Sequence, residues 1–155
     1  MIYVFLADGF EETEAITPID MLRRAKLDVK LVGVGTSTPT SSHGIRVTAD
    51  LTEAETKLDS SVQLIVLPGG MPGTLNLEKS PVVQSAIKYC VEKGIPVGVI
   101  CAAPSILGKL GLLNGRKAVC FPGFEQYLTG AEVLNKLCVT DGQFTTACGA
   151  GAAIE

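Results

Sequence analysis

Histidine and paired cysteines are scarce in this sequence. It contains one histidine, His43, and five cysteines with no C-x-x-C pair among them. A disulfide framework normally uses an even number of cysteines, and zinc sites need clustered cysteine and histidine ligands. We therefore expect neither disulfides nor a bound metal. We expect His43 to be a solvated loop residue or to lie at a subunit contact.

Long apolar runs are also absent. No run approaches the ~18 residues that a membrane-spanning helix needs. Met1 leads directly into a strand-like segment, without the basic flank and the small-residue cleavage site of a signal peptide. These absences predict a soluble, cytoplasmic protein without a membrane partner.

An excess of basic charge is missing as well. Thirteen Lys and Arg residues stand against sixteen Asp and Glu residues, which gives a formal net charge of −3. No basic stripe and no aromatic platform is present, so we expect no nucleic-acid partner. The length of 155 residues, 46% of them hydrophobic, predicts a single domain over residues 1–155 with a substantial core.

The sequence does contain an alternation of short β-branched runs and helical patterns. Strands are predicted at 2–6, 29–34, 45–49, 62–67, 96–100 and 117–121. The first predicted helix begins near Glu11 or at Pro18 and ends at about Ala25. A weak helix is predicted from Asp50 or Thr52 to Leu58. Two further helices are predicted, one from Ser80-Pro81 to Gly94 and one beyond Cys101 to Leu110. Such alternation is typical of an α/β fold with a mostly parallel sheet.

A hairpin signal stands near the end of the chain. Asp141-Gly142 separates the strand-like segments 137–140 and 143–147, and this dipeptide favours a type I′ turn. We therefore expect an antiparallel pair at one end of the sheet.

The stretch from Pro96 to Leu107 predicts a strand, a cysteine, a tight turn and a helix. Cys101 follows the apolar strand directly, and Pro104 suits the first turn of a helix. A thiol at that position would face the N–H groups of the helix, which favour the thiolate. An inert, buried cysteine fits the local residues equally well.

A second strand ends in a loop with three glycines, residues 68–73. The N–H groups near Gly69 and Gly70 could form an anion-binding concavity, although a simple strand-to-helix turn has the same composition. No Lys-Ser or Lys-Thr pair follows, so the loop is not a phosphate-binding P-loop.

Four strand ends are expected to meet in one crevice, because ligands bind beyond the carboxyl ends of parallel strands. Glu14 would be the carboxyl group nearest an apolar helix, where burial and the nearby thiolate would raise its pKa. The protonated Glu14 would then donate a hydrogen bond that holds Cys101 as a thiolate, and would supply a proton to a carbonyl substrate. The N–H groups of Gly70 and Ala102 would stabilise an oxyanion. Alternatively, Glu14 is an exposed carboxylate in a first helical turn. Cys148 is the other candidate for the reactive cysteine.

Four segments together resemble the ThiJ/PfpI superfamily, and within it the branch of the parkinsonism-associated protein deglycase and its bacterial relatives. They are A-D-G-F-E-E-T-E-A-I-T-P-I-D-M-L-R-R-A, V-L-P-G-G-M-P-G, I-C-A-A-P and T-A-C-G-A-G, and in this order they cover nearly the whole chain. The resemblance implies a flavodoxin-like α/β sandwich, usually a homodimer. It also implies catalytic roles for Cys101 and Glu14, and anion-binding backbone at Gly69, Gly70 and Ala102.

The same resemblance implies a function. Relatives are described as glyoxalases or protein deglycases that act on small reactive carbonyls or glycated substrates without a cofactor. Others are described as oxidative-stress proteins that respond through a cysteine, and some carry an older name from thiazole monophosphate synthesis in thiamine biosynthesis. We expect the enzymatic function, with a peroxide sensor as the alternative.

The chain departs from the family pattern in two places. Phe121 stands where many members have a histidine, which removes an imidazole base, and the sequence stops at Glu155 before the usual C-terminal helix. Peptidase and amidotransferase branches fit less well, because Ala102 and Ala103 replace the residues that they use after the cysteine.

Overall fold

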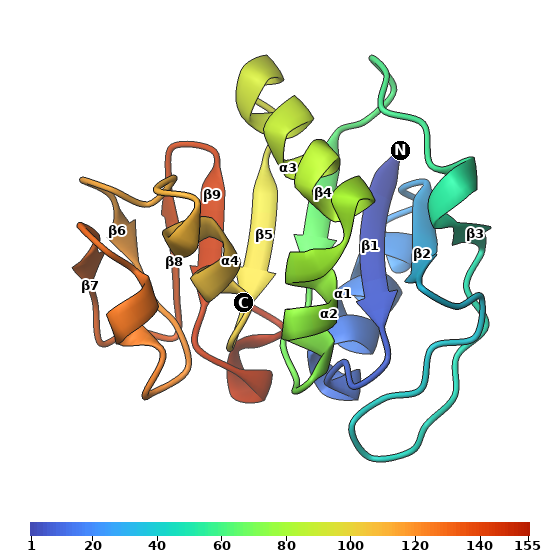
Figure 1. The fold of residues 1–155 in the computed structure, drawn as a ribbon, viewed down its shortest axis with the longest axis horizontal. Helices are drawn as coiled ribbons and strands as arrows, with labels where there is room; N and C mark the ends of the chain where they lie inside the picture. Colours follow the sequence, from blue (N-terminus) through green and yellow to red (C-terminus); the bar gives the residue numbers. More distant parts are fainter.

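The computed structural model describes all residues, 1–155, and is organised around a seven-stranded sheet with the order β3-β2-β1-β4-β5-β9-β8. All neighbouring strands are parallel except β8 and β9, which pair antiparallel at one end (Figure 1). The strands are β1 (Ile2–Ala7), β2 (Val29–Val34), β3 (Leu51–Thr52), β4 (Leu64–Leu67), β5 (Val97–Ile100), β8 (Cys138–Asp141) and β9 (Phe144–Ala147). The predicted mostly parallel sheet with a terminal hairpin is therefore confirmed.

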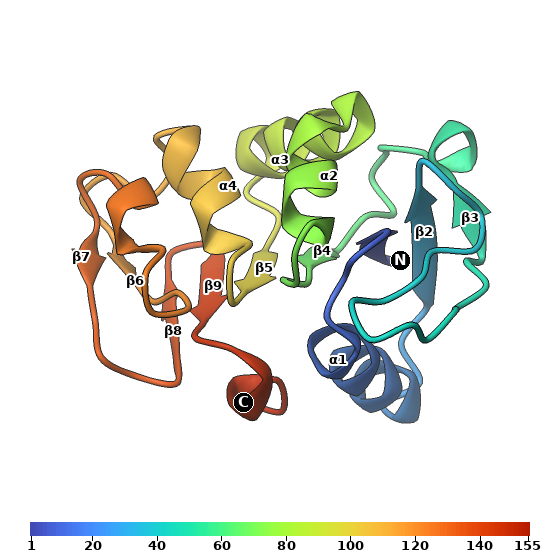
Figure 2. The same ribbon diagram turned by 60° about the horizontal axis from the view of Figure 1, so that its bottom comes forward.

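Helices cover the two faces of the sheet unequally. One face carries α2 (Gly73–Lys79), α3 (Pro81–Lys93) and α4 (Pro104–Lys109), while the other carries α1 (Glu12–Arg24) and the short turn η3 (Ala150–Ala152), as Figure 2 shows. A separate parallel pair, β6 (Lys117–Ala118) and β7 (Glu132–Val133), lies beyond the edge of the sheet. The remaining short turns are η1 (Glu53–Glu55) and η2 (Glu125–Tyr127).

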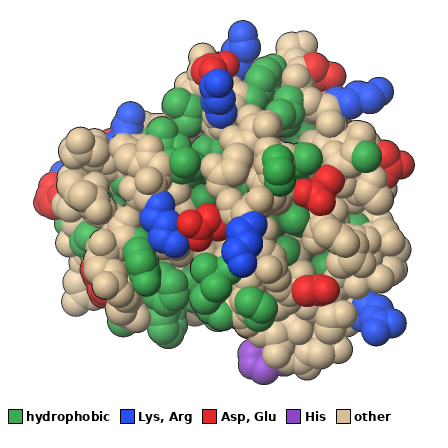
Figure 3. Space-filling view, viewed as in Figure 1, with side chains coloured by type: hydrophobic (Ala, Val, Ile, Leu, Met, Phe, Trp, Pro, Cys, Tyr) green, Lys and Arg blue, Asp and Glu red, His purple; other side chains and the backbone are tan.

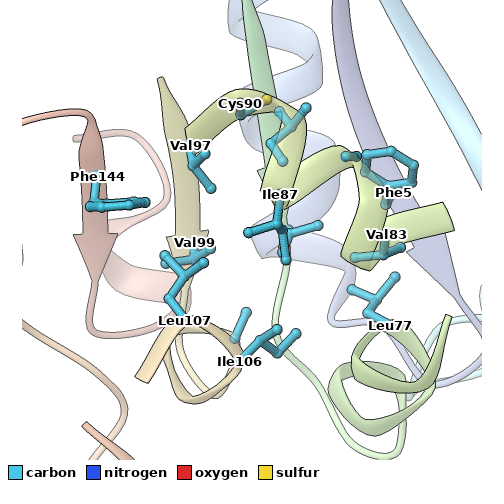
Figure 4. Close-up of a cluster of buried hydrophobic side chains, with 14 of the residues drawn as sticks. Phe5, Leu77, Val83, Ile87, Cys90, Val97, Val99, Ile106, Leu107 and Phe144 are labelled. Carbon is cyan, nitrogen blue, oxygen red and sulfur yellow. The ribbon is translucent and has the colours of Figure 1, made fainter. Parts of the chain in front are cut away.

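The inner strand β1 is buried on both faces, as an inner strand of a parallel sheet must be. Its alternate residues Tyr3, Phe5 and Ala7 enter the larger core under α2, α3 and α4. Ile2, Val4 and Leu6 enter a smaller core under α1. Figure 4 shows side chains of β1, α2, α3, β5, α4 and β9 meeting in the larger core, among them Phe5, Leu77, Ile87, Val99, Ile106 and Phe144.

Strong local signals were interpreted correctly. Ser80 caps α3 by accepting a hydrogen bond from the Val83 N–H, and Gly94 ends the helix with a φ of 67°. The alternatives for the first helix are resolved as well. Glu11 is its N-cap and Pro18 lies inside it, so the helix begins near Glu11.

The secondary-structure predictions that rested on weak local patterns were wrong in three places. The predicted strand at 45–49 is absent, because Ile45 is exposed and only an isolated bridge joins Thr40 to Arg46. The edge strand is β3 instead, next to Asp50, whose N–H donates to the Leu31 carbonyl. The weak helix from Thr52 is only the turn η1, and α2 was not predicted because it begins with glycine and is short.

Two boundaries near the end of the chain also differ. The predicted strand 117–121 ends at Ala118. Beyond it, the backbone N–H groups no longer pair with a neighbouring strand. The Val119 N–H donates to the Thr146 hydroxyl, and the Phe121 N–H donates to the Cys101 carbonyl. The hairpin turn is shifted by one residue. Asp141 pairs with Phe144, which leaves Gly142 and Gln143 as the turn.

No helix of the chain combines the length and the apolar character needed to cross a membrane. On the face drawn in Figure 3, lysine and arginine side chains lie scattered among acidic ones rather than in a continuous basic stripe.

Candidate functional site

Cys101 sits at a sharp bend directly after β5. Its φ of +64° is a left-handed conformation that few residues other than glycine adopt. Two backbone hydrogen bonds hold it there: its N–H donates to the Ala147 carbonyl at 2.9 Å, and its carbonyl accepts from the Phe121 N–H at 2.8 Å. Such strain, fixed from both sides, is a feature of functional positions.

Glu14 reaches the same bend from α1. Only 2% of the residue is exposed, and its backbone N–H donates to the Glu11 carboxylate at 2.7 Å in the first turn of the helix. Its own Oε2 accepts from the Gly69 N–H at 2.9 Å, and its carboxyl group also interacts with the Cys101 side chain and with the Ala150 N–H. Glu14 is therefore buried, and the alternative of an exposed first-turn carboxylate is wrong.

Gly69 makes this contact possible. A Cβ atom at this position would lie 2.6 Å from the Cys101 Cβ and 2.6 Å from Glu14 Oε2, closer than real Cβ atoms approach their neighbours. The N–H groups of Gly70 and Ala102 lie beside the Cys101 sulfur. The structure thus brings together the residues that the sequence singled out, namely Glu14, Gly69, Gly70, Cys101 and Ala102.

The pKa shifts of Glu14 and Cys101 agree only in part with the predicted pairing of a protonated Glu14 with a Cys101 thiolate. Burial, with a smaller contribution from the Glu11 charge, raises the pKa of Glu14 to about 6, as expected in direction. Burial and the Glu14 carboxylate also raise the pKa of Cys101, to about 12, and the Ala102 and Gly70 N–H groups only partly oppose this. These directions do not favour the resting thiolate that the sequence predicted. Since the pKa of the Glu14 carboxyl group is raised but stays below that of the Cys101 thiol, Glu14 is placed to accept the thiol proton.

The other cysteines lie outside this contact. Cys148 is half-buried, its N–H donates to the Leu137 carbonyl, and it packs with Cys138 beside Ala152. Cys90 is fully buried in the larger core, as predicted, and burial raises its pKa to about 11. Cys101 is the cysteine whose side chain interacts with Glu14.

A cluster that sequence reasoning missed lies on the adjoining loop. Donor atoms of Glu11, Glu12 and His43 fall within 4.8 Å of one another. The His43 Nδ1 is 2.8 Å from Glu12 Oε1, and Glu11 already accepts from the Glu14 N–H, so these contacts account for the grouping. The side chain of His43 is 73% exposed, as expected of a solvated loop histidine. About thirty residues separate it from the glutamates, and no local pattern indicates their proximity.

The chain is similar to several known proteins. A sequence model described as the DJ-1/PfpI family matches residues 1–155. Protein DJ-1 homolog B of Arabidopsis thaliana is 37% identical over 158 residues, and the match covers 99% of this chain but only 35% of that longer protein. Deglycase PH1704 of Pyrococcus horikoshii is 32% identical over 143 residues, which covers 90% of this chain and 84% of that protein.

A solved structure gives the same result. A DJ-1 superfamily protein of Salmonella typhimurium, crystallised as a cysteine-to-alanine mutant, matches with a TM-score of 0.91 and 32% identity, over 98% of this chain and 83% of that chain. The resemblance and the flavodoxin-like fold expected from the motifs are thereby confirmed.

The buried carboxyl group makes a testable contribution to stability. Because the folded-state pKa of Glu14 lies above its ordinary value of 4.5, its protonation stabilises the fold. That contribution is complete below pH 4.5 and is lost as the pH rises through about 6. A Glu14→Gln variant carries no charge. Its free energy of unfolding, relative to that of the wild type, should increase by about 2 kcal/mol between roughly pH 4 and roughly pH 8.

Urea unfolding at both pH values measures this difference. Glu92→Gln is the matched control, because the Glu92 side chain is exposed on α3 and should show no such change. A Glu14→Gln variant whose relative stability is independent of pH would show that Glu14 titrates normally.

Proposed function

Because the chain belongs to the DJ-1/PfpI family, we propose that it is a cofactor-independent enzyme in which Cys101 attacks small reactive carbonyl compounds or glycated groups, as in a glyoxalase or deglycase. The observation that carries the proposal is the buried contact of the Glu14 carboxylate with the Cys101 thiol. A base held against a nucleophile is the arrangement that nucleophilic catalysis needs. The relative named as a deglycase supports the substrate class.

The first step is addition of the thiol to an α-oxoaldehyde. Glu14 takes the Cys101 proton while the sulfur bonds to the aldehyde carbon, and the carbonyl electron pair moves to oxygen. The N–H groups of Gly70 and Ala102, which already lie beside the sulfur, stabilise this oxyanion. Return of the proton from Glu14 to the oxygen gives a hemithioacetal.

The second step is an internal redox reaction. The Glu14 carboxylate removes the proton from the carbon bonded to sulfur and delivers it to the adjacent carbonyl carbon, while the hydroxyl proton of the hemithioacetal passes to the former carbonyl oxygen. One carbon is oxidised to a thioester while its neighbour is reduced to an alcohol. Water then cleaves the thioester, which releases a 2-hydroxy acid and restores the thiol. Oxidation and reduction occur within one substrate, so the reaction balances without a cofactor.

Removal of the sulfur tests the role of Cys101. Turnover of methylglyoxal to lactate by Cys101→Ser should fall by at least about a thousandfold, because the covalent intermediate cannot form at a comparable rate. Cys148→Ser is the matched control and should retain activity. Full activity in Cys101→Ser, or its loss in Cys148→Ser, would contradict the assignment.

The pH dependence tests the role of Glu14. If the carboxylate is the base, kcat/KM should rise about tenfold per pH unit below the Glu14 pKa and level off above it. The inflection is expected at about pH 6, from the raised pKa of the buried carboxyl. A fall in kcat/KM through that range would instead mean that protonated Glu14 assists a preformed thiolate.

A peroxide sensor is the second function suggested by the sequence, and the raised pKa of Cys101 argues against it. Peroxide reacts with thiolates, so a protonated thiol is oxidised slowly. Intact-mass spectrometry after mild peroxide treatment near neutral pH should therefore show no selective addition of two oxygens in the wild type relative to Cys101→Ser. Selective addition at Cys101, together with undetectable turnover of carbonyl substrates, would favour the sensor.

A further inference from the structure

Glu11 is joined to Glu14 and Gly69 by a closed ring of three hydrogen bonds. The Glu11 backbone N–H donates to the Gly69 carbonyl at 2.9 Å, and the Gly69 N–H donates to Glu14 Oε2 at 2.9 Å. The Glu14 N–H donates in turn to Glu11 Oε2 at 2.7 Å, which closes the ring. Glu11 therefore links the first turn of α1 to the loop after β4, and the Glu14 carboxyl group is one member of that link.

The glycine loop packs tightly against this ring of hydrogen bonds. A Cβ atom on Gly70 would collide with the Glu11 backbone nitrogen, and one on Gly69 would collide with the Cys101 Cβ and with Glu14 Oε2. The Glu11 backbone thus lies directly against the loop that contacts Cys101. A shift of the first turn of α1 would move the Glu14 carboxyl group relative to the sulfur, and a displacement of about 1 Å between reacting groups can cost about a hundredfold in rate.

The Glu11 carboxylate also places a negative charge beside the Glu14 carboxyl group. Burial is the larger cause of the raised pKa of Glu14, and the Glu11 charge raises it further because like charges disfavour ionisation. The other groups that face Glu14 are the Cys101 side chain and the N–H groups of Gly69 and Ala150, which lower its pKa. Serine, threonine or asparagine would also cap the helix, but none of them carries this charge.

We propose that Glu11 is a positioning residue that acts through Glu14: its carboxylate fixes the first turn of α1 and so holds the Glu14 carboxyl group against the Cys101 thiol. The negative charge of Glu11 also makes Glu14 a stronger base, since it favours the protonated form of its neighbour. This inference rests on the proposed function, in which Glu14 accepts the thiol proton. It adds a residue that controls both the place and the strength of that base.

Three substitutions of Glu11 separate the hydrogen bond from the charge. Aspartate keeps both, glutamine keeps an uncharged oxygen that can accept from the Glu14 N–H, and alanine keeps neither. With methylglyoxal as the substrate, kcat/KM of Glu11→Ala on the high-pH plateau should fall by about tenfold or more, because the base is no longer held in place. On the same plateau, Glu11→Asp and Glu11→Gln should stay within about threefold of the wild type.

The pH profile distinguishes this role from that of a helix cap alone. The inflection of kcat/KM at about pH 6 should move to lower pH in Glu11→Gln and stay in place in Glu11→Asp. Glu12→Gln is the matched control, because Glu12 lies in the same turn but its carboxylate pairs with His43. Its plateau and inflection should equal those of the wild type. Wild-type kcat/KM in Glu11→Ala, or an unmoved inflection in Glu11→Gln, would overturn the proposal.

Amide hydrogen exchange tests the ring of hydrogen bonds without turnover. In Glu11→Ala, the amide protons of both Glu14 and Gly69 should exchange at least about tenfold faster than in the wild type. The Val83 amide, which Ser80 caps in α3, should exchange at the wild-type rate. Faster exchange at Glu14 alone would indicate a simple helix cap and overturn the positioning role. Absence of Cys101-dependent turnover in the wild type would overturn the proposed function instead, and the exchange rates would still decide whether Glu11 holds Glu14 in place.

Discussion

The buried contact between Glu14 and Cys101 is the constraint on which the site depends. It joins a helix after β1 to a bend after β5, two strands that are separated in the sheet by β4. Gly69, at the end of β4, lies between them and leaves no room for a side chain. A larger residue would force the carboxyl and the sulfur apart. Because Gly69 has no Cβ atom, the chain segments after β1, β4 and β5 pack closely enough for the Glu14 carboxyl group to contact the Cys101 side chain.

Burial of this pair determines which atom holds the proton. Burial raises the pKa of both groups, but the carboxyl starts from a much lower value and remains the stronger acid. The backbone amides of Gly70 and Ala102 favour the thiolate, yet burial and the nearby carboxylate outweigh them. The site is consequently suited to general-base activation at the moment of attack rather than to a permanently ionised sulfur. A protonated thiol also reacts with peroxide more slowly than a thiolate does.

The sequence predicted the parts of the fold that have strong local causes. The inner strands are continuous apolar runs, and α3 has a serine cap, a proline in its first turn and a closing glycine. The convergence of Glu14, Gly69 and Cys101 was predictable because parallel strands end at the same edge of the sheet. The short helix α2 and the loop near Ile45 lack such signals, since their conformation depends on contacts that are distant in the sequence.

The errors within the site have the same origin. The position of Cys101 before a helix indicated a low pKa, but the outcome depends on the burial of the sulfur and on the short distance to a charge. Neither quantity is encoded in a local pattern. Likewise, T-A-C-G-A-G indicated a strand end without indicating that the Ala150 N–H approaches Glu14 or that Gly149 faces Phe121.

Backbone groups and side chains contribute differently to this site. The groups that would bind an oxyanion are backbone N–H groups, and the Glu14 carboxyl group is held by a backbone hydrogen bond from Gly69. Substitutions on the surface of the bend leave these groups in place. The ring of Phe121, by contrast, is a partly exposed side chain that can be exchanged without moving the Cys101 backbone, since its link to the bend is its own N–H group. A substitution of this ring would therefore change the surface beside Cys101 while the backbone groups that hold Glu14 and Cys101 stay in place.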